Sequence, residues 1–212
     1  NELEYKEVFM FLKRFSFFKP YTKRYINSLY FDTLDFKSVK DNISGVAFRD
    51  KVRLRWYDDS KSLPVLEKKN KIGRAGFKYR INTCFKTIEE LNTLTSKQIC
   101  NNIFKNKNIN KFSGLITQTN FFPILLVKYK RKYYKSNKNI RITIDSKIQF
   151  SHVTLNKPLA FQKKISYNRI VMEIKFPLEK KDHVNDLIRQ LRLTPTRHSK
   201  YLVGVSKLGY AK

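Results

Sequence analysis

Apolar and polar residues alternate along much of this chain, and side chains two apart on a strand point to the same face. The alternating segments that read as strands are residues 2–12, 27–33, 46–58, 63–71, 77–82, 123–135, 139–150 and 167–176. Short polar turns separate 46–58 from 63–71 and 123–135 from 139–150, so each pair is predicted to form a hairpin. The pattern therefore predicts a protein rich in antiparallel strands.

Other segments space their apolar residues three or four apart, as an amphipathic helix does. Residues 86–105 and 180–192 have this spacing, and Thr87 followed by Glu90 is a candidate capping box for the first of them. Shorter helical segments are expected at residues 35–45 and 112–120, with a loop at 105–111. No repeat or linker interrupts the 212 residues, so residues 1–212 are expected to form one domain.

Several of the predicted strands carry lysine or arginine on alternate residues, so their charges line one face. The phased cations are Arg49, Lys51, Arg53, Arg55, Lys69, Lys71, Lys78 and Arg80, with Arg131, Arg141 and Lys175 in later strands. If the strands close into a barrel, such a face would line a channel for a phosphate-rich ligand, because arginine binds phosphate oxygens in pairs. An open sheet whose charged face meets solvent fits the pattern equally well.

The composition favours an anionic partner for a folded domain. The formal net charge is +28, from 45 Lys and Arg against 17 Asp and Glu. Aromatic residues make up 14% of the chain, which excludes a disordered basic tail. The two cysteines, Cys84 and Cys100, form no CxxC motif, so we expect a reducing, cytoplasmic setting.

No apolar run is long enough for a membrane span, and no signal peptide opens the chain. Because the first residue is not Met, the sequence is expected to be a domain excised from a longer protein. A membrane segment or membrane partner would then lie outside it.

The few acidic residues are informative because some lie in phase with the cations: Glu2, Glu4, Glu67, Asp145 and Glu173. A carboxylate among cations either pairs with them or holds a divalent metal. Mg²⁺ and Mn²⁺ prefer oxygen ligands and often share them with substrate phosphates. Glu173, flanked by apolar residues in V-M-E-I-K-F, is the best single metal candidate, and a salt bridge to a neighbouring cation is the alternative.

Seven ordered motifs between Glu2 and Tyr201 carry a family resemblance. They are E-L-E-Y-K, S-L-Y-F-D-T, R-D-K-V-R-L-R-W-Y, E-K-K-N-K, R-I-T-I-D with M-E-I-K-F, and T-R-H-S-K-Y. The first resembles the ExExK signature of the CYTH superfamily, the triphosphate tunnel metalloenzymes. The set as a whole resembles the catalytic domain of the vacuolar transporter chaperone (VTC) complex and its bacterial relatives. The resemblance implies an α+β fold: a closed tunnel of eight antiparallel strands with flanking helices.

The resemblance also implies a polyphosphate polymerase, which moves the γ-phosphoryl group of ATP onto a growing polyphosphate chain. The catalytic residues would be Lys6, Arg53, Arg55 and Lys200. The phosphate-binding residues would be Lys51, Lys69, Lys71, Lys78, Arg80, Arg131, Arg141, Lys175 and Ser199. Glu173 and Glu4 would bind Mn²⁺ or Mg²⁺.

Three other functions remain open at the level of sequence. A tunnel triphosphatase would use the same cations and metal with water as the attacking group. A module without catalytic activity would only bind polyphosphate or another polyanion. A generic RNA-binding domain would bind with a steep salt dependence, but the phased cations and the family resemblance disfavour it, so no sequence-specific nucleic acid partner is expected. ATP binding would not use a P-loop, because the chain has no GxxxxGK[ST] motif.

Overall fold

The structure, a computed structural model, describes residues 2–58, 63–73, 75–104, 121–191 and 193–210, with side chains from residue 6 onward. The strands are β1 (Arg24–Asp32), β2 (Phe48–Tyr57), β3 (Val65–Ile72), β4 (Ala75–Asn82), β5 (Phe122–Lys135), β6 (Arg141–His152), β7 (Lys164–Tyr167) and β8 (Val171–Lys175). The helices are α1 (Glu2–Arg14), α2 (Lys37–Ile43), α3 (Ile88–Thr93), α4 (Ser96–Phe104), α6 (Lys181–Gln190) and α7 (Lys200–Lys207), with 3-10 turns η1 (Leu159–Phe161) and η2 (Leu178–Lys180). The loop predicted at 105–111 and the helix predicted at 112–120 lie outside the described residues.

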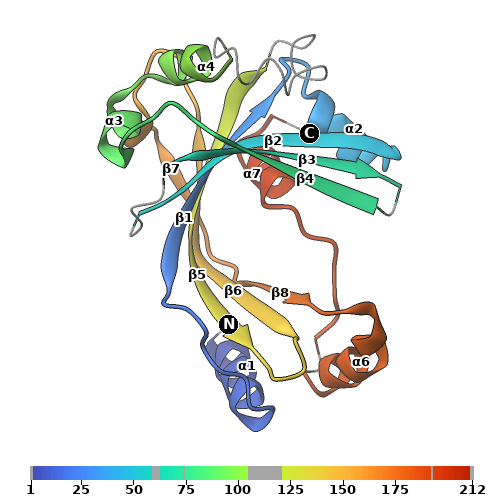
Figure 1. The fold of residues 1–212 in the computed structure, drawn as a ribbon. Coiled ribbons are helices and arrows are strands. Elements are labelled where there is room, and N and C mark those ends of the chain that lie inside the picture. The colour runs from blue at the N-terminus through green and yellow to red at the C-terminus, as the bar shows by residue number, and fades with distance from the viewer. Residues whose placement is uncertain (1, 59–62, 74, 105–120, 192, 211–212) are drawn as a thin grey trace. The chain divides into compact units, whose positions relative to one another are not determined.

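All eight strands belong to one antiparallel sheet (Figure 1). Seven follow the order β4-β3-β2-β1-β5-β6-β7, and β8 pairs with β6 beside them. The sheet and its helices confirm the predicted α+β class. Among the described residues no pairing joins β4 to β7, so closure of the sheet stays a prediction.

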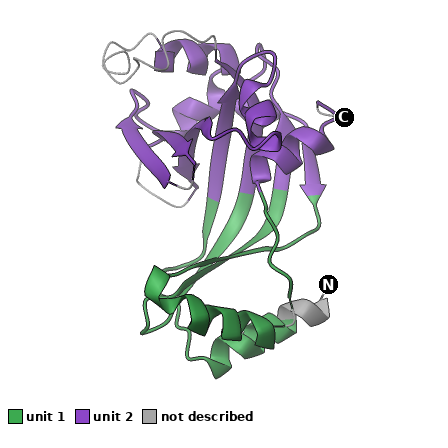
Figure 2. Ribbon diagram, turned by 90° about the vertical axis from the view of Figure 1, so that its right-hand side faces the viewer, with its two compact units in different colours: residues 1–25, 129–148, 167–198 green, residues 26–128, 149–166, 199–212 purple. Residues whose placement is uncertain are grey.

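The chain divides into two compact units (Figure 2). Unit 1 contains residues 1–25, 129–148 and 167–198, and unit 2 contains residues 26–128, 149–166 and 199–212. The long strands β5 and β6 pass from one unit into the other. Each unit has its own apolar core.

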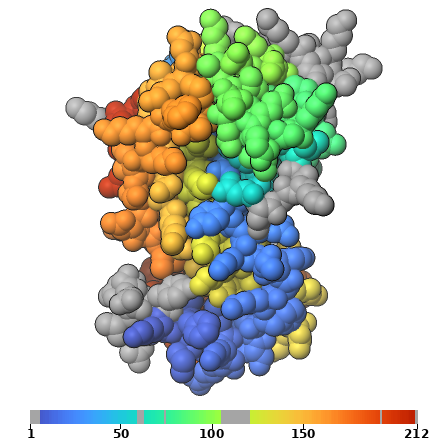
Figure 3. Space-filling model, turned by 90° about the vertical axis from the view of Figure 1, so that its left-hand side faces the viewer, coloured from blue at the N-terminus to red at the C-terminus, as the bar shows by residue number. Residues whose placement is uncertain are grey.

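The core of unit 2 is built on the apolar face of β1, β2 and β3. Leu54 and Trp56 alternate with the arginines of β2 and are buried in this core. Ile99 and Ile103 of α4 pack into the same cluster. Figure 3 shows α3 and α4 beside the segment that contains η1, and the backbone N–H of Lys97 donates to the carbonyl of Leu155 there.

A single helix over residues 86–105 is wrong, because the segment forms two helices. The first begins as predicted, since the Thr87 hydroxyl accepts a hydrogen bond from the Glu90 backbone N–H. The chain then becomes extended at Leu94, with ψ 142°. Thr95 and Gln98 cap α4 reciprocally: each side chain accepts from the other residue's backbone N–H. This second capping box, of the form T-x-x-Q, marks the start of a new helix.

The strand predicted at residues 2–12 is also wrong, because this segment forms helix α1. Phe11 and Leu12 are buried in the core of unit 1, and Val8 and Phe15 pack against it. These four positions are spaced i, i+3, i+4 and i+7, which places them on one side of a helix. The alternation of E-L-E-Y-K is too short to override this longer pattern.

The same core contains the apolar side of α6, including Val184 and Leu187, as predicted for residues 180–192. The predicted strand 167–176 is confirmed in part by β8, and β7 precedes it as a strand that was not predicted, with residues 168–170 between the two. No helix in the described part of the chain is both long and apolar enough to cross a bilayer.

Candidate functional site

The strands β2, β3 and β4 bring the alternating cations of unit 2 together on one face. Their antiparallel register aligns Lys51, Lys69 and Lys78 across the three strands, and we call this set the lysine row. The next positions align Arg53, Glu67 and Arg80, which we call the arginine row. The opposite face of β2 carries the buried core residues, so the pleat of the strand separates core from charge.

Glu67 is the charge centre of this face. Its side chain is only 4% exposed, and both carboxylate oxygens contact cations. Oε2 lies 2.6 Å from Nη2 of Arg53 and 3.7 Å from Nη1 of Arg55. Oε1 lies 3.2 Å from Nε of Arg80 and also contacts Nζ of Lys78. Four cations from two strands therefore share one carboxylate on the strand between them.

Burial alone would raise the pKa of the Glu67 carboxyl, but its cations outweigh this effect. Arg53 and Arg55, with the hydrogen bonds from Lys78 and Arg53, lower that pKa to about 2. Glu67 therefore stays ionised across the physiological range. It holds one negative charge against four positive ones, so this face keeps a strong attraction for further anions.

The two arginines of β2 are also held from β1. Arg53 donates to the Tyr30 hydroxyl at 3.2 Å, and Arg55 donates to the Ser28 hydroxyl at 3.4 Å. Their side chains are 24% and 12% exposed, whereas Lys69, Lys78 and Arg80 are exposed, so the open-sheet alternative fits the outer cations but not these two arginines. Burial opposes ionisation of Tyr30, but Arg53 and Arg55 lower the pKa of its hydroxyl below the ordinary value.

The lysine row meets helix α7 at Ser199. The Ser199 hydroxyl caps α7 by accepting from the Leu202 backbone N–H, and it also accepts from Nζ of Lys51 at 3.2 Å. Burial lowers the pKa of Lys51 to about 8; the nearby Lys69, Arg49 and Arg53 act in the same direction and Tyr30 opposes them.

Close packing fixes the helix that carries Ser199 and Lys200. A Cβ atom on Gly204 would lie 2.5 Å from a side-chain carbon of Leu125 and 2.8 Å from one of Phe150. Only glycine lets α7 approach β5 and β6 this closely. Tyr201 stacks on Tyr30, with ring centroids 4.9 Å apart, and donates to the buried carboxylate of Asp32 at 2.5 Å. The Ser-Lys pair is thus presented from a rigid element.

Unit 1 contains a second charged cluster, centred on Arg131. Its guanidinium makes two hydrogen bonds to the buried carboxylate of Asp145, at 2.6 and 2.7 Å. Burial opposes the charge of Arg131, but Asp145 outweighs this and raises its pKa above the ordinary value. Oε2 of Glu173 lies 3.9 Å from the same guanidinium, and Oε1 lies 3.3 Å from Nζ of Lys175.

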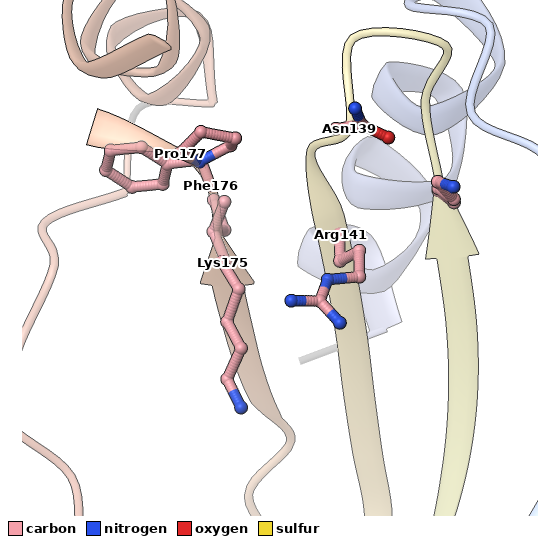
Figure 4. Close-up of a pocket in the computed structure, with 7 residues that line it drawn as sticks. Asn139, Arg141, Lys175, Phe176 and Pro177 are labelled. Atoms are coloured by element: carbon pink, nitrogen blue, oxygen red, sulfur yellow. The ribbon is translucent and has the colours of Figure 1, made fainter. Parts of the chain in front are cut away.

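Arg141 and Lys175 are partners in the β6–β8 register and line a pocket of about 780 Å³ within unit 1. Lys135, Asn139, Ile174, Phe176 and Pro177 complete its lining. Figure 4 shows the guanidinium of Arg141 directed toward the strand that carries Lys175. Two predicted phosphate ligands therefore face one open volume.

The residues fit a divalent metal only in part. In the described part of the chain no three His, Cys, Asp or Glu residues gather as a metal site. Glu173 has a half-exposed carboxylate whose oxygens lie 3.3 Å from Lys175 and 3.9 Å from Arg131, so the group is accessible from solvent although both oxygens have cation contacts. Mg²⁺ and Mn²⁺ are often held by one or two carboxylates together with substrate phosphates. Glu173 suits such a metal, whereas the side chain of Glu4 lies outside the described residues.

Two predicted residues stand apart from these contacts. Lys6 is exposed on α1 rather than on the strand predicted for residues 2–12, and its catalytic role stays a prediction. Lys71 aligns with Arg49 and Gly76, two residues along β3 from the lysine row.

Three residues of these clusters were not among the predicted site residues: Glu67, Tyr30 and Asp145. Glu67 and Asp145 were identified only as carboxylates in phase with the cations. The phase of Glu67 within E-K-K-N-K was the available signal for its position. Its four partners depend on the register of three strands, which the sequence alone does not supply.

A family model described as the VTC domain matches residues 3–209. Among solved structures, HpAC1 from Hippeastrum is similar over 98% of this chain and 91% of its own, at 13% identity and a TM-score of 0.56. The PH1819 protein of Pyrococcus horikoshii OT3 is similar over 96% of this chain and 93% of its own, at 16% identity and a TM-score of 0.48. No curated protein matches the sequence.

Proposed function

Because this chain belongs to the VTC domain family, we propose that it is a polyphosphate polymerase, which transfers the γ-phosphoryl group of ATP to the end of a growing polyphosphate chain. The observation that supports this most is the cationic face of β2, β3 and β4, where Glu67 is outnumbered four to one. A linear polyanion supplies the missing negative charge. The proposal includes closure of the sheet into a tunnel, as the family resemblance implies.

In this proposal, the cations do most of the catalytic work. Phosphoryl transfer passes through a loose transition state, so the protein mainly positions the reactants and stabilises charge. Arg53 and Arg55 would grip phosphate oxygens with planar, pre-oriented forks, and the lysine row would add point charge. Ser199 and Lys200 would contact the phosphate at the reacting end.

No strong general base is needed. The terminal phosphate of an acceptor chain is already largely ionised near neutral pH, since its second pKa is about 6. Holding donor and acceptor in line would therefore supply much of the rate enhancement. In unit 1, Arg131, Arg141 and Lys175 are proposed as further phosphate ligands.

Glu173 would hold Mn²⁺ or Mg²⁺ together with donor phosphates. When bound, the metal would neutralise charge on the phosphate oxygens. Lys175 lies 3.3 Å from Glu173, so it would help to orient the carboxylate in the absence of the metal.

The direct test is incubation of the purified protein with ATP and Mn²⁺, followed by gel separation of the products and an ADP assay. A ladder of long phosphate chains with stoichiometric ADP is expected. ADP with free phosphate and no ladder would contradict the polymerase.

A tunnel triphosphatase is the second candidate. HpAC1, which shares the fold, is described as having a dominant triphosphatase activity. The two functions differ in whether water or a phosphate chain attacks the γ-phosphorus. Inorganic tripolyphosphate as sole substrate separates them, because only the triphosphatase releases orthophosphate in proportion to time from that substrate without lengthening it.

A further inference from the structure

The contacts of Glu67 divide by oxygen. Among the described residues, the cations that contact Oε2 are the mostly buried β2 arginines, Arg53 and Arg55. Oε1 contacts the β4 cations, Lys78 and Arg80, whose side chains are 37% and 66% exposed. One oxygen therefore holds the inner cations, and the other holds cations that an incoming ligand can reach.

The carboxylate also has the chemistry of a phosphate substitute. Two acceptor oxygens spread over several nitrogen donors reproduce part of what a phosphate group offers the same cations. Without any anion, cations held on facing strands repel one another. Glu67 relieves that repulsion in the arginine row, and the adjacent lysine row contains no carboxylate of its own.

We propose that Glu67 is a resident counter-ion and positioning residue. It keeps Arg53 and Arg55 in place through Oε2 and releases Lys78 and Arg80 from Oε1 to an incoming phosphate chain. This inference rests on the proposed function, because it takes the ligand to be a phosphate chain bound on this face.

The transfer of Lys78 and Arg80 from Glu67 to the phosphate chain has two expected effects. Glu67 competes with the ligand for the β4 cations, so its removal should tighten phosphate binding. It also fixes the guanidinium that meets the reacting phosphate, so its removal should slow turnover. A residue with a merely structural role would weaken both binding and turnover when replaced.

The test compares wild type with Glu67→Gln, using tripolyphosphate as the probe and measuring thermal unfolding, calorimetric Kd and ATP turnover. The free variant should unfold at a lower temperature than wild type. Saturating tripolyphosphate should raise its unfolding temperature by more than it raises that of wild type, because the ligand replaces the missing charge. The Kd should fall severalfold while kcat falls at least tenfold, and Glu67→Asp should recover part of kcat.

Asp50→Asn is the matched control. Asp50 pairs with the buried Lys68 at 3.1 Å on the opposite face of the same strands. This variant removes the same charge, so it should lose stability without a larger ligand-induced shift.

The possible results distinguish failure of the phosphate site from failure of the proposed role of Glu67. If tripolyphosphate shifts neither wild type nor the variant, the phosphate site itself fails. If it shifts both equally, or if Kd weakens together with kcat, the phosphate site stands and the role of Glu67 is wrong.

If Glu67→Gln fails to fold, the double variant Glu67→Gln with Lys78→Met tests the counter-ion role instead. It removes one charge of each sign and should recover soluble, folded protein. Equal failure of the double variant would overturn the counter-ion role.

Discussion

Each unit of the molecule holds a nearly inaccessible carboxylate among cations, but the two are used differently. Asp145 in unit 1 accepts two hydrogen bonds from one guanidinium, that of Arg131, at 2.6 and 2.7 Å. Glu67 in unit 2 divides its oxygens among four cations. A bidentate pair holds a single cation in one orientation, whereas a carboxylate shared by four cations leaves an excess of positive charge that a ligand can use. The first arrangement favours rigidity and the second favours binding.

The largest effect on stability is expected from breaking the fixed pair. Asp145→Asn leaves a mostly buried guanidinium without its bidentate partner, which should cost about 3–5 kcal/mol of unfolding free energy. Denaturant unfolding measures this. The control is Asp186→Asn, which breaks an exposed pair with Arg189 and should cost at most ~1 kcal/mol. Equal costs for the two variants would contradict the difference in role between a buried and an exposed pair.

The largest effect on activity is expected at Arg53. Arg53→Ala should lower turnover at least ~100-fold, because it removes a preorganised charge from the proposed reacting phosphate. Arg53→Lys should not restore it, since lysine lacks the planar fork. Arg49→Ala removes the same charge from the same face of β2 without a Glu67 contact, so it should lose much less. Steady-state ATP turnover by all three variants is the measurement, and similar losses at positions 49 and 53 would contradict a specific role for Arg53.

The lysine row should make anion binding depend on pH. Because the pKa of Lys51 is lowered to about 8, Lys51 loses its charge as the pH rises through that value in the free protein. A bound anion favours the charged form, so tripolyphosphate should bind most tightly below pH 8, and its affinity should weaken by up to about tenfold per pH unit above it.

The free energy of unfolding should change in the opposite direction with pH. Between pH 8 and the ordinary lysine pKa the unfolded chain binds a proton that the folded chain has lost, so the contribution of Lys51 to stability improves as the pH rises.

Lys51→Met tests this assignment by calorimetric titration from pH 7 to 9.5. The variant should bind more weakly at pH 7 and lose the step near pH 8. A step of unchanged size in the variant would assign the titration to another group.

The smallest effect is expected at Arg80. Its side chain is 66% exposed, so Arg80→Ala should change unfolding free energy by less than ~1 kcal/mol. Binding of tripolyphosphate should weaken only a few-fold. A loss as large as that of Arg53→Ala would contradict the division between inner and outer cations.

The sequence predicted the unit 2 site better than the unit 1 site for a physical reason. In β2, β3 and β4 the cations repeat every second residue while apolar residues fill the opposite phase, so period and burial agree. Lys51, Arg53 and Lys78 therefore share the predicted face. The phase of Glu67 allowed a pairing with cations to be predicted, but which cations it meets, and the contact of Ser199 with Lys51, depend on strand register and the docking of α7.

The main error in the predicted secondary structure arose where a strand periodicity and a helix periodicity overlap in the sequence. Eight strands were predicted and the described residues also form eight, but helix α1 replaced the first, β8 alone lies within the last predicted strand, and β7 was not predicted. At the N-terminus a short alternation in E-L-E-Y-K was preferred over the helical spacing of Val8, Phe11, Leu12 and Phe15. The core contacts of that spacing decide the structure. The roles of Lys6 and Glu4 were implied by the family resemblance and stay predictions, although the strand expected to carry both residues is helix α1.

The most direct test of the central claim is calorimetric titration of wild type and Arg53→Ala with tripolyphosphate and with orthophosphate at pH 7 and fixed salt. The account predicts a saturable site for tripolyphosphate in wild type, much weaker binding of orthophosphate, and at least tenfold weaker tripolyphosphate binding in Arg53→Ala. Identical titrations for the two proteins would show that the cationic face of β2, β3 and β4 attracts anions only through its net charge, and would contradict the account.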